Sequence, residues 1–455
     1  MQWKHIHRIT HFFIYALLIC TPLAVEVSFG SLKINMPTEP LLIITAVLLF
    51  FAIDIKTLWQ SSFIRHPLTL LAISYQFWMT FMVVFSSDWL ISLKYVLVNN
   101  VHFWVFYFGF YHFTQNQKLP LLRWVGSYGL ALIVVIFLAW FKFMQFDFNI
   151  NVAVILAQPF YNDNTIFSAS LVFVLSVTFL IPNKNATFKF LKVVVLLLVG
   201  SAIFITYCRA AWSSIFLVSL VIFLIIIFNL KIKHFLALAF FLVLTIGLFL
   251  PTISNNLTSI KTESKKGNWL DQLASIGNIT TDVSNLERIN RYKCAIRMFK
   301  DRPITGFGPG TYQYAYLPYQ KTSEMTRISM QKDATTTLDK PQNGRGGGAH
   351  SEYLQALSEL GIFGFLCWLA LLFLIFYTAL KVYFDETTTK PNKKLTMTIL
   401  FATLAYLVHA TFNNFMHSEE VAILFWPMIA MLVLIRVGSE PRAMSHESRA
   451  TSHEP

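Results

Sequence analysis

Apolar runs long enough to cross a bilayer recur along almost the whole chain. A helix needs about 20 largely apolar residues to span the hydrocarbon core. Twelve runs approach that length, at about 10–28, 39–55, 67–87, 89–111, 122–142, 164–182, 188–207, 210–230, 233–252, 359–381, 395–415 and 419–437. The second run is short, and residues 150–160 form a further apolar stretch. The pattern predicts an all-α integral membrane protein with about twelve transmembrane helices.

One long polar segment, residues 253–358, interrupts this pattern between the ninth and tenth runs. Within it we predict a helix from Ser284 to Lys300, because Ser284 and Glu287 match a capping box and apolar residues recur every three or four positions. The expected apolar stripe consists of Leu286, Ile289, Tyr292, Ile296 and Phe299. Basic residues occupy the other faces, a pattern typical of helices that lie on a membrane surface.

The polar segment ends in a second short helix that leads into the tenth run. The Gly-rich stretch before it predicts a flexible loop. Ser351 is a suitable N-cap for a helix through Glu359, and Gly361 provides a C-terminal break. A second break at Gly364 would let this helix turn into the membrane span. His350 therefore stands at a loop-to-helix junction beside the membrane.

Composition supports the membrane assignment, and the distribution of charge orients it. Of the 455 residues, 55% are hydrophobic and 13% are charged, whereas soluble domains carry about 25% charged residues. The net charge of +13 is compatible with nucleic acid binding, but Lys and Arg gather in alternate connections, as the positive-inside rule requires. A nucleic-acid-binding protein would not segregate charge in this way. We expect both termini in the cytoplasm and the polar segment outside.

The chain accordingly divides into four parts. Residues 1–252 hold transmembrane helices 1–9, and residues 253–358 form an external loop with the amphipathic helix and a catalytic segment. Residues 359–437 hold helices 10–12. Residues 438–455 are polar, and we expect a disordered cytoplasmic tail.

Four residues at the outer side are candidates for chemistry on an anion. The imidazole of His350 titrates near neutral pH and can take a proton from a hydroxyl. Arg209 interrupts an apolar stretch at the outer ends of the seventh and eighth runs, where an ionisable residue is a candidate functional group. Arg288 and Arg291 lie one helical turn apart and can face one anion. A surface histidine, a snorkelling arginine and a solvated charge run are the simpler interpretations of the same residues.

Other motifs argue against a nucleotide or a metal. Gly306-Phe307-Gly308-Pro309-Gly310 lacks the Gly-Lys-Ser/Thr ending of a phosphate loop and is better interpreted as a tight turn. We expect His409 to be a hydrogen-bonded packing residue. No HExxH or Cys/His spacing is present, so we expect no catalytic metal and no cofactor, although five outer-side residues could ligate one: His350, Glu352, His417, Glu419 and Glu420.

Three motifs, in this topology, resemble the O-antigen ligase family, the superfamily that also holds O-antigen polymerases and bacterial protein O-oligosaccharyltransferases. They are Thr206-Tyr207-Cys208-Arg209-Ala210-Ala211, then Arg288 through Asp301-Arg302-Pro303-Ile304-Thr305-Gly306-Phe307-Gly308-Pro309-Gly310, and Ala349-His350-Ser351-Glu352-Tyr353-Leu354-Gln355-Ala356-Leu357-Ser358-Glu359-Leu360-Gly361. The family often has Ser and Asn where this chain has Cys208 and Ser351. Both changes leave the charged groups intact.

The resemblance implies an inverting, metal-independent glycosyltransferase of the membrane-embedded GT-C type, located in the bacterial inner membrane. The donor would be a glycan on undecaprenyl diphosphate at the periplasmic face, and the acceptor a lipid A–core sugar. The implied roles are general base for His350 and diphosphate binding for Arg209 and for one or both of Arg288 and Arg291.

Other functions remain open at this point. An O-antigen polymerase or a protein O-oligosaccharyltransferase shares the same motifs, and would differ only in the acceptor. A polytopic transporter or flippase is a further alternative. Transporters place charges at mid-membrane on broken helices and carry inverted repeats, whereas the unusual charges here lie at the outer rim and no repeat is visible.

Overall fold

The computed structural model describes residues 2–439 except 30–31, 115–119, 229–282, 327–329, 333–338 and 342–346. The predicted ninth span (233–252), the first part of the polar segment and the tail therefore lie outside the described residues. The described chain is mostly helical.

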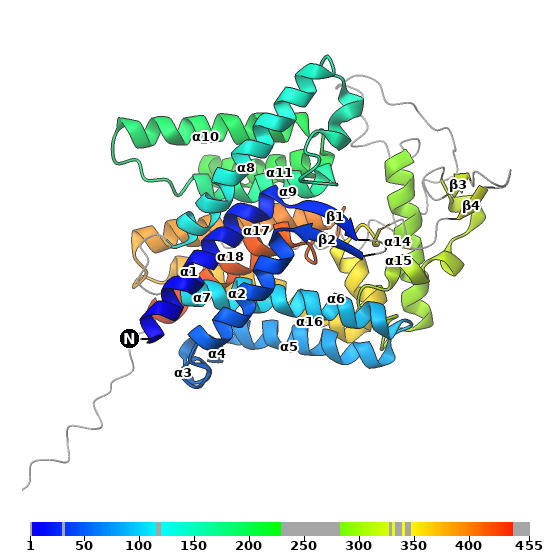
Figure 1. The fold of residues 1–455 in the computed structure, drawn as a ribbon, viewed down its shortest axis with the longest axis horizontal. Helices are drawn as coiled ribbons and strands as arrows, with labels where there is room; N and C mark the ends of the chain where they lie inside the picture. Colours follow the sequence, from blue (N-terminus) through cyan, green and yellow to red (C-terminus); the bar gives the residue numbers. More distant parts are fainter. Residues whose placement is uncertain are drawn as a thin grey trace, which may run out of the picture.

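The apolar runs within the described residues coincide largely with helices (Figure 1). In chain order these are α1 (Gln2–Cys20), α2 (Thr38–Ala52), α3 (Ile55–Gln60), α4 (Ser62–Arg65), α5 (Pro67–Phe81), α6 (Trp89–Phe103), α7 (Gly109–Thr114), α8 (Pro120–Gln145), α9 (Asn164–Thr178), α10 (Ala186–Ile205), α11 (Arg209–Phe228), α16 (Glu352–Phe384), α17 (Lys390–Ala410) and α18 (Glu419–Ser439). Helices α14 (Val283–Asp301) and α15 (Tyr312–Ala315) belong to the polar segment.

Six of the described helices are long and apolar enough to cross a membrane by themselves. They are α1 and α5, whose spans extend to Leu23 and Phe85, and α8, α10, α16 and α18. Shorter apolar helices occupy Thr38–Ala52, Asn164–Thr178 and Arg209–Val221. The chain is thus a helical, multi-pass membrane protein, and the count of about twelve spans stays a prediction.

A β-hairpin replaces the end of the first predicted span. Helix α1 ends at Cys20, and β1 (Val25–Phe29) pairs antiparallel with β2 (Leu32–Met36), with Val27 opposite Ile34. The expectation of a helical run through residue 28 was therefore wrong. Residues 25–29 and 32–36 alternate apolar and polar positions, which is the pattern of a strand with one face buried. A second hairpin joins β3 (Met330–Lys332) to β4 (Asp339–Pro341).

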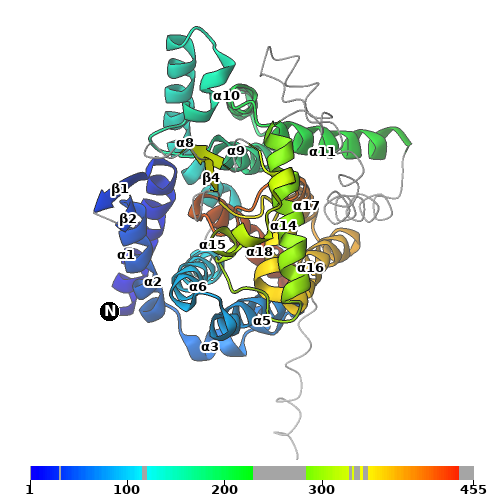
Figure 2. The same ribbon diagram turned by 90° about the vertical axis from the view of Figure 1, so that its right-hand side faces the viewer.

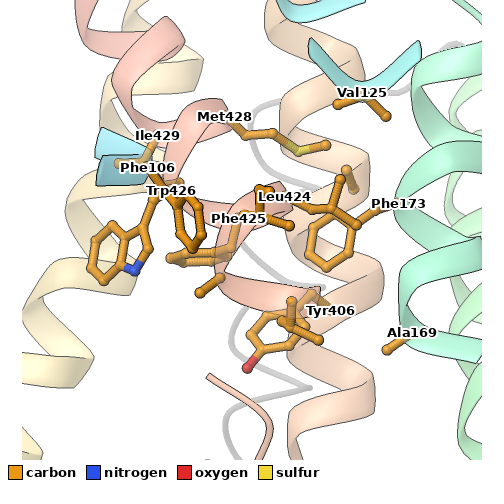
Figure 3. Close-up of a cluster of buried hydrophobic side chains, with 14 of the residues drawn as sticks. Phe106, Val125, Ala169, Phe173, Tyr406, Leu424, Phe425, Trp426, Met428 and Ile429 are labelled. Atoms are coloured by element: carbon orange, nitrogen blue, oxygen red, sulfur yellow. The ribbon is translucent and has the colours of Figure 1, made fainter. Parts of the chain in front are cut away.

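Helix α18 is the most buried of the candidate spans and forms the centre of the bundle (Figure 3). Its aromatic residues pack against several neighbours, with the rings of Trp426 and Phe103 at 4.8 Å. Pro427 lies inside this helix and cannot donate to the carbonyl of Ile423, four residues earlier. The indole Nε1 of Trp124 donates to that carbonyl at 2.8 Å. The unpaired backbone group is thereby satisfied where no water would reach it.

Helix α16 contains a sharp kink, which positions the segment before it. Gly361 has a φ of 66° and a ψ of −169° inside the helix, as the predicted break requires. The carbonyls just before the kink accept hydrogen bonds from other elements: Phe307 N to Ser358 O at 3.0 Å, Gly308 N to Glu359 O at 2.9 Å, and Trp78 Nε1 to Leu360 O at 3.1 Å. The further break expected at Gly364 is wrong, because the turn into the span is completed at Gly361.

Most of the polar residues of interest lie at one end of the bundle. This end, called here the α14 end, carries α14, α15, the β1–β2 hairpin and the connection 411–418 between α17 and α18 (Figure 1). Figure 2 looks onto it, with α14 beside the start of α16.

Candidate functional site

The three motifs of the sequence meet around the last residues of α17. Arg288 of α14 donates through Nε to the carbonyl of Phe412 at 3.4 Å. The backbone N–H of His350 donates to Oδ1 of Asn414 at 3.2 Å. Cys208 lies with its sulfur 3.8 Å from Nε2 of His409. Segments separated by up to about two hundred residues of sequence therefore form one site.

His350 has an unusual backbone conformation that its neighbours hold in place. Its φ is 54°, in the left-handed region that few non-glycine residues adopt. Its carbonyl accepts a hydrogen bond from the hydroxyl of Tyr292 at 3.2 Å, and Ala349 N donates to Gln355 Oε1 at 2.7 Å. Ser351 caps α16 by accepting from Leu354 N, as predicted. The surrounding contacts compensate for the strained backbone, an arrangement frequent at functional sites.

Arg291 binds the backbone of the segment that leads to His350, on the side that faces the protein interior. Its side chain is 2% exposed and pairs with Glu287, with Nε 2.9 Å from Oε1. Its Nη1 donates to the carbonyls of Gly347 and Gly348, each at 2.9 Å, and the guanidinium lies over the ring of Tyr316. Most of its donors are thus already bound within the protein. The structure therefore favours a positioning role for Arg291 over direct contact with a ligand.

The imidazole of His350 is in an environment that keeps it neutral. Burial lowers the pKa of His350 well below its usual value, and the positive charges of Arg291 and Arg288 lower it further. An imidazole with a lowered pKa is deprotonated at neutral pH and can accept a proton. This is the protonation state that a general base needs.

Arg288 is half-buried and points toward the same region as His350. Besides the Phe412 carbonyl, its guanidinium contacts the hydroxyl of Ser284 at 3.0 Å and Oδ1 of Asn285 at 3.3 Å. These three partners are a carbonyl, a hydroxyl and an amide oxygen. The positive charge of Arg288 reaches His350, whose pKa is lowered by burial first, then by Arg291 and then by Arg288.

Arg209 is the first residue of α11, directly after a tight turn. Tyr207 in this turn has a φ of 48°, and the amide of Asn164 donates to the carbonyl of Thr206 at 2.9 Å. A helix N-terminus carries partial positive charge and unpaired N–H groups. The guanidinium of Arg209 and the N-terminus of α11 therefore reinforce each other as a location for an anion.

His409 lies between the turn that precedes Arg209 and the connection 411–418, which contacts Arg288. It is 1% exposed, and its Nδ1 lies 3.2 Å from the amide nitrogen of Asn413. Its Nε2 faces the hydroxyl of Ser168 at 3.5 Å as well as the Cys208 sulfur. The prediction of a hydrogen-bonded packing residue is confirmed.

Glu352 has a role that we did not anticipate from the sequence. Its Oε1 accepts from the hydroxyl of Tyr406 at 3.0 Å, from Met416 N at 2.6 Å and from Phe415 N. One carboxylate oxygen thus holds the connection that also provides Asn414 to His350. In the sequence, Glu352 is an acidic residue in the first turn of a helix. That position indicates only a favourable helix start.

A carboxylate of the protein itself binds the backbone of the glycine-rich segment 306–310. Gly306, Gly308 and Gly310 have positive φ, and the carboxylate of Glu359 accepts from Gly310 N and Tyr312 N, each at 2.9 Å. The turn interpretation is confirmed, since the N–H groups that could hold a phosphate bind a carboxylate instead.

Helix α14 differs from the predicted helix in its cap and in its buried face. Ser284 lies inside the helix, which begins at Val283, and the carboxylate of Glu287 binds Arg291 and Thr326. The capping box is therefore wrong. The buried face also includes polar residues, with Glu287, Asn290 and Arg291 at 3%, 1% and 2% exposure. The helix packs into the protein because those polar groups find partners there.

Within the described residues no group of three or more His, Cys, Asp or Glu is arranged to hold a metal ion. The five outer-side candidates are dispersed: Glu352 binds backbone N–H groups, whereas His417, Glu419 and Glu420 line a separate cavity.

The fold and the site define a multi-pass helical membrane protein with a neutral histidine and arginines gathered at one end. Residues 193–369 of this chain match the family model described as O-antigen ligase. The match runs from α10 to α16 and includes Arg209, Arg288, Arg291 and His350. It confirms the resemblance to the O-antigen ligase family and supports an enzyme of the ligase or polymerase type. A comparison with curated proteins gave no match.

Proposed function

We propose that this protein is an O-antigen ligase-like glycosyltransferase. It moves a glycan from undecaprenyl diphosphate to a lipid A–core acceptor at the periplasmic face of the bacterial inner membrane. The observation that supports this most strongly is the meeting of His350, Arg288 and the Arg209 turn around the end of α17. A neutral base close to guanidinium groups suits attack of a hydroxyl on a carbon that bears a diphosphate leaving group.

The reaction needs one proton transfer and one displacement. The acceptor oxygen forms a bond to the anomeric carbon while its proton passes to the imidazole of His350. The bond from that carbon to the phosphate oxygen breaks, and the electron pair leaves with undecaprenyl diphosphate. Attack opposite the leaving group inverts the anomeric configuration. Arg288 and Arg209 neutralise the charge of the leaving group, and no metal is required.

Donor binding would also change the pKa of His350. Arg288 and Arg291 lower the pKa of the free His350. A diphosphate held by Arg288 cancels part of this positive field and therefore makes the imidazole more basic. The base would gain strength only when the donor is present.

The test compares His350→Gln and Arg288→Gln with the wild type, using purified lipid-linked donor and lipid A–core in detergent. We expect His350→Gln to lower kcat by about 10²–10⁴-fold with donor KM little changed, and Arg288→Gln to raise donor KM. The matched control is His5→Gln, an exposed histidine of α1 near the opposite end. Unchanged transfer by both variants would rule out the mechanism.

The same assay identifies the acceptor. Lipid A–core is replaced in turn by a peptide and by a second lipid-linked glycan. Transfer to lipid A–core supports a ligase. Preference for the peptide would indicate a protein O-oligosaccharyltransferase, and elongation of the second glycan would indicate a polymerase. Movement of the donor across vesicles without transfer would instead indicate a flippase.

A further inference from the structure

A second cavity lies at the α14 end, separate from the site around His350. It has a volume of about 690 Å³ and is bounded by α2, the β1–β2 hairpin, α6, residues 160–163 and residues 417–420. This is within the usual size range of small-molecule sites, about 300–1,000 Å³. Asn414 contacts His350 while His417 lines the cavity, so the connection 411–418 contributes to both.

One wall of the cavity is apolar and faces outward from the bundle. Ile43 of α2 and Leu97 and Val98 of α6 line it and are 62%, 56% and 40% exposed. In a membrane-spanning bundle, exposed apolar side chains of this kind meet lipid. The cavity is therefore accessible from the side, between α2 and α6, to a molecule whose tail stays in the bilayer.

Acidic residues line the remaining walls. Five carboxyl side chains line the cavity, from Glu26, Glu39, Asp163, Glu419 and Glu420, and Lys94 is the one Lys or Arg among its described lining residues. Burial lowers the pKa of His417 to about 4, so its imidazole does not offset the acidic charge. Lys94 is exposed and lies one turn along α6 from Leu97 and Val98.

Two buried polar atoms of residues that line this cavity lack a partner among the described residues. Oε1 of Glu419 and Nδ1 of His102 accept or donate no hydrogen bond there, although the two residues are only 4% and 3% exposed. An unsatisfied buried polar atom destabilises the folded protein. Both residues line the cavity, so a polar ligand that enters it would lie next to both side chains.

We propose that this cavity binds the headgroup of a membrane lipid that carries a primary ammonium next to a phosphate, as an ethanolamine phospholipid does. The ammonium enters the acidic interior and donates to Oε1 of Glu419. The phosphate stays at the rim beside Lys94, and the acyl chains leave between α2 and α6. An anionic headgroup without an ammonium is disfavoured, because the carboxylates repel it.

The experiment uses the full chain in vesicles that contain phosphatidylethanolamine or phosphatidylglycerol with a photoreactive group near the head of the acyl chain. Crosslinks are mapped by mass spectrometry. The variants are Ile43→Trp, which fills the entrance, and Glu419→Gln, which removes the inner carboxyl group. Ile44→Trp is the matched control, since Ile44 is also exposed on α2, at 42%, and is not among the lining residues.

We expect the ethanolamine probe to label peptides of α2 and α6, and each of the two variants to reduce this labelling about tenfold, the effect of about 1.4 kcal/mol. Ile44→Trp should leave it unchanged. Equal labelling by the glycerol probe would overturn the proposal, as would loss of labelling in Ile44→Trp or the absence of specific labelling. If Ile43→Trp does not fold, Glu39→Gln replaces it, with reduced ethanolamine labelling expected. The readout is independent of glycan transfer.

Discussion

The protonation of His350 depends on charges contributed by another helix. Its pKa is lowered by burial first and then by Arg291 and Arg288. A lowered pKa means that the imidazole stays neutral as the pH falls through 6.5 and takes up its proton only below that value. Activity that requires the neutral form is therefore flat near neutral pH and is lost on the acid side.

This predicts the pH dependence of kcat/KM for the donor. The acid limb should have an apparent pKa below about 6.5. Arg288→Gln removes one positive charge beside His350, so the limb should move to higher pH. Lys56→Gln, which changes an exposed residue of α3, should leave the limb in place. An acid limb that does not move in Arg288→Gln would show that this arginine does not act on the base.

Arg291 and Arg288 should differ in their effect on stability. Arg291→Met removes the positive charge that pairs with the carboxylate of Glu287, which is 4% exposed. Breaking a buried pair in this way costs about 3–5 kcal/mol. Arg288 is half-buried, whereas Arg291 is 2% exposed, so Arg288→Met should cost less. Denaturant unfolding in detergent measures both, and a larger loss for Arg288→Met would contradict the assignment.

At the scale of elements, the kink in α16 depends on one glycine. Gly361 has a φ of 66°, and a Cβ added there would lie 2.1 Å from the carbonyl oxygen of Ile304. Gly361→Ala should therefore destabilise the protein by about 1–3 kcal/mol from the backbone alone, and by more from the clash. Gly126→Ala is the control, because nothing lies within 4 Å of the added Cβ. It should be neutral or stabilising in a helix, and both are compared by thermal unfolding.

The sequence predicts these elements unequally well, for physical reasons. The break at Gly361 follows from local chemistry and was predictable. The hairpin at residues 25–36 was also encoded, in a period-two alternation masked by its high apolar content. The buried face of α14 was not predictable from periodicity, because Arg291 is buried by carbonyls 56 residues away. The burial of Glu359 was not predictable from local sequence either, because its partners lie 47 and 49 residues away.

At the scale of the whole molecule, the distribution of basic residues predicts the orientation. Lys184, Lys189 and Lys192 flank the α9–α10 connection, and Lys390, Lys393 and Lys394 begin α17. Both groups lie at the end opposite the α14 end, since the connections alternate along the bundle. The positive-inside rule therefore predicts that this opposite end is cytoplasmic.

Single cysteines and a membrane-impermeant thiol reagent test this orientation in cells. Asp147→Cys and Glu386→Cys lie at exposed positions near opposite ends and are introduced after replacement of the four native cysteines. We expect Asp147→Cys to react from outside, whereas Glu386→Cys should react only after the inner membrane is permeabilised. The reverse pattern would invert the topology and move His350 to the cytoplasmic side.

The hydrogen bond from His350 N to Asn414 has a consequence for biosynthesis. A ribosome completes the chain from the N-terminus, so Arg209, Arg288 and His350 all emerge before the residue that anchors the histidine backbone. The connection 411–418 becomes available only after α17 has been inserted. A nascent chain that ends within α17 should therefore be inactive even though it carries every residue assigned to the reaction.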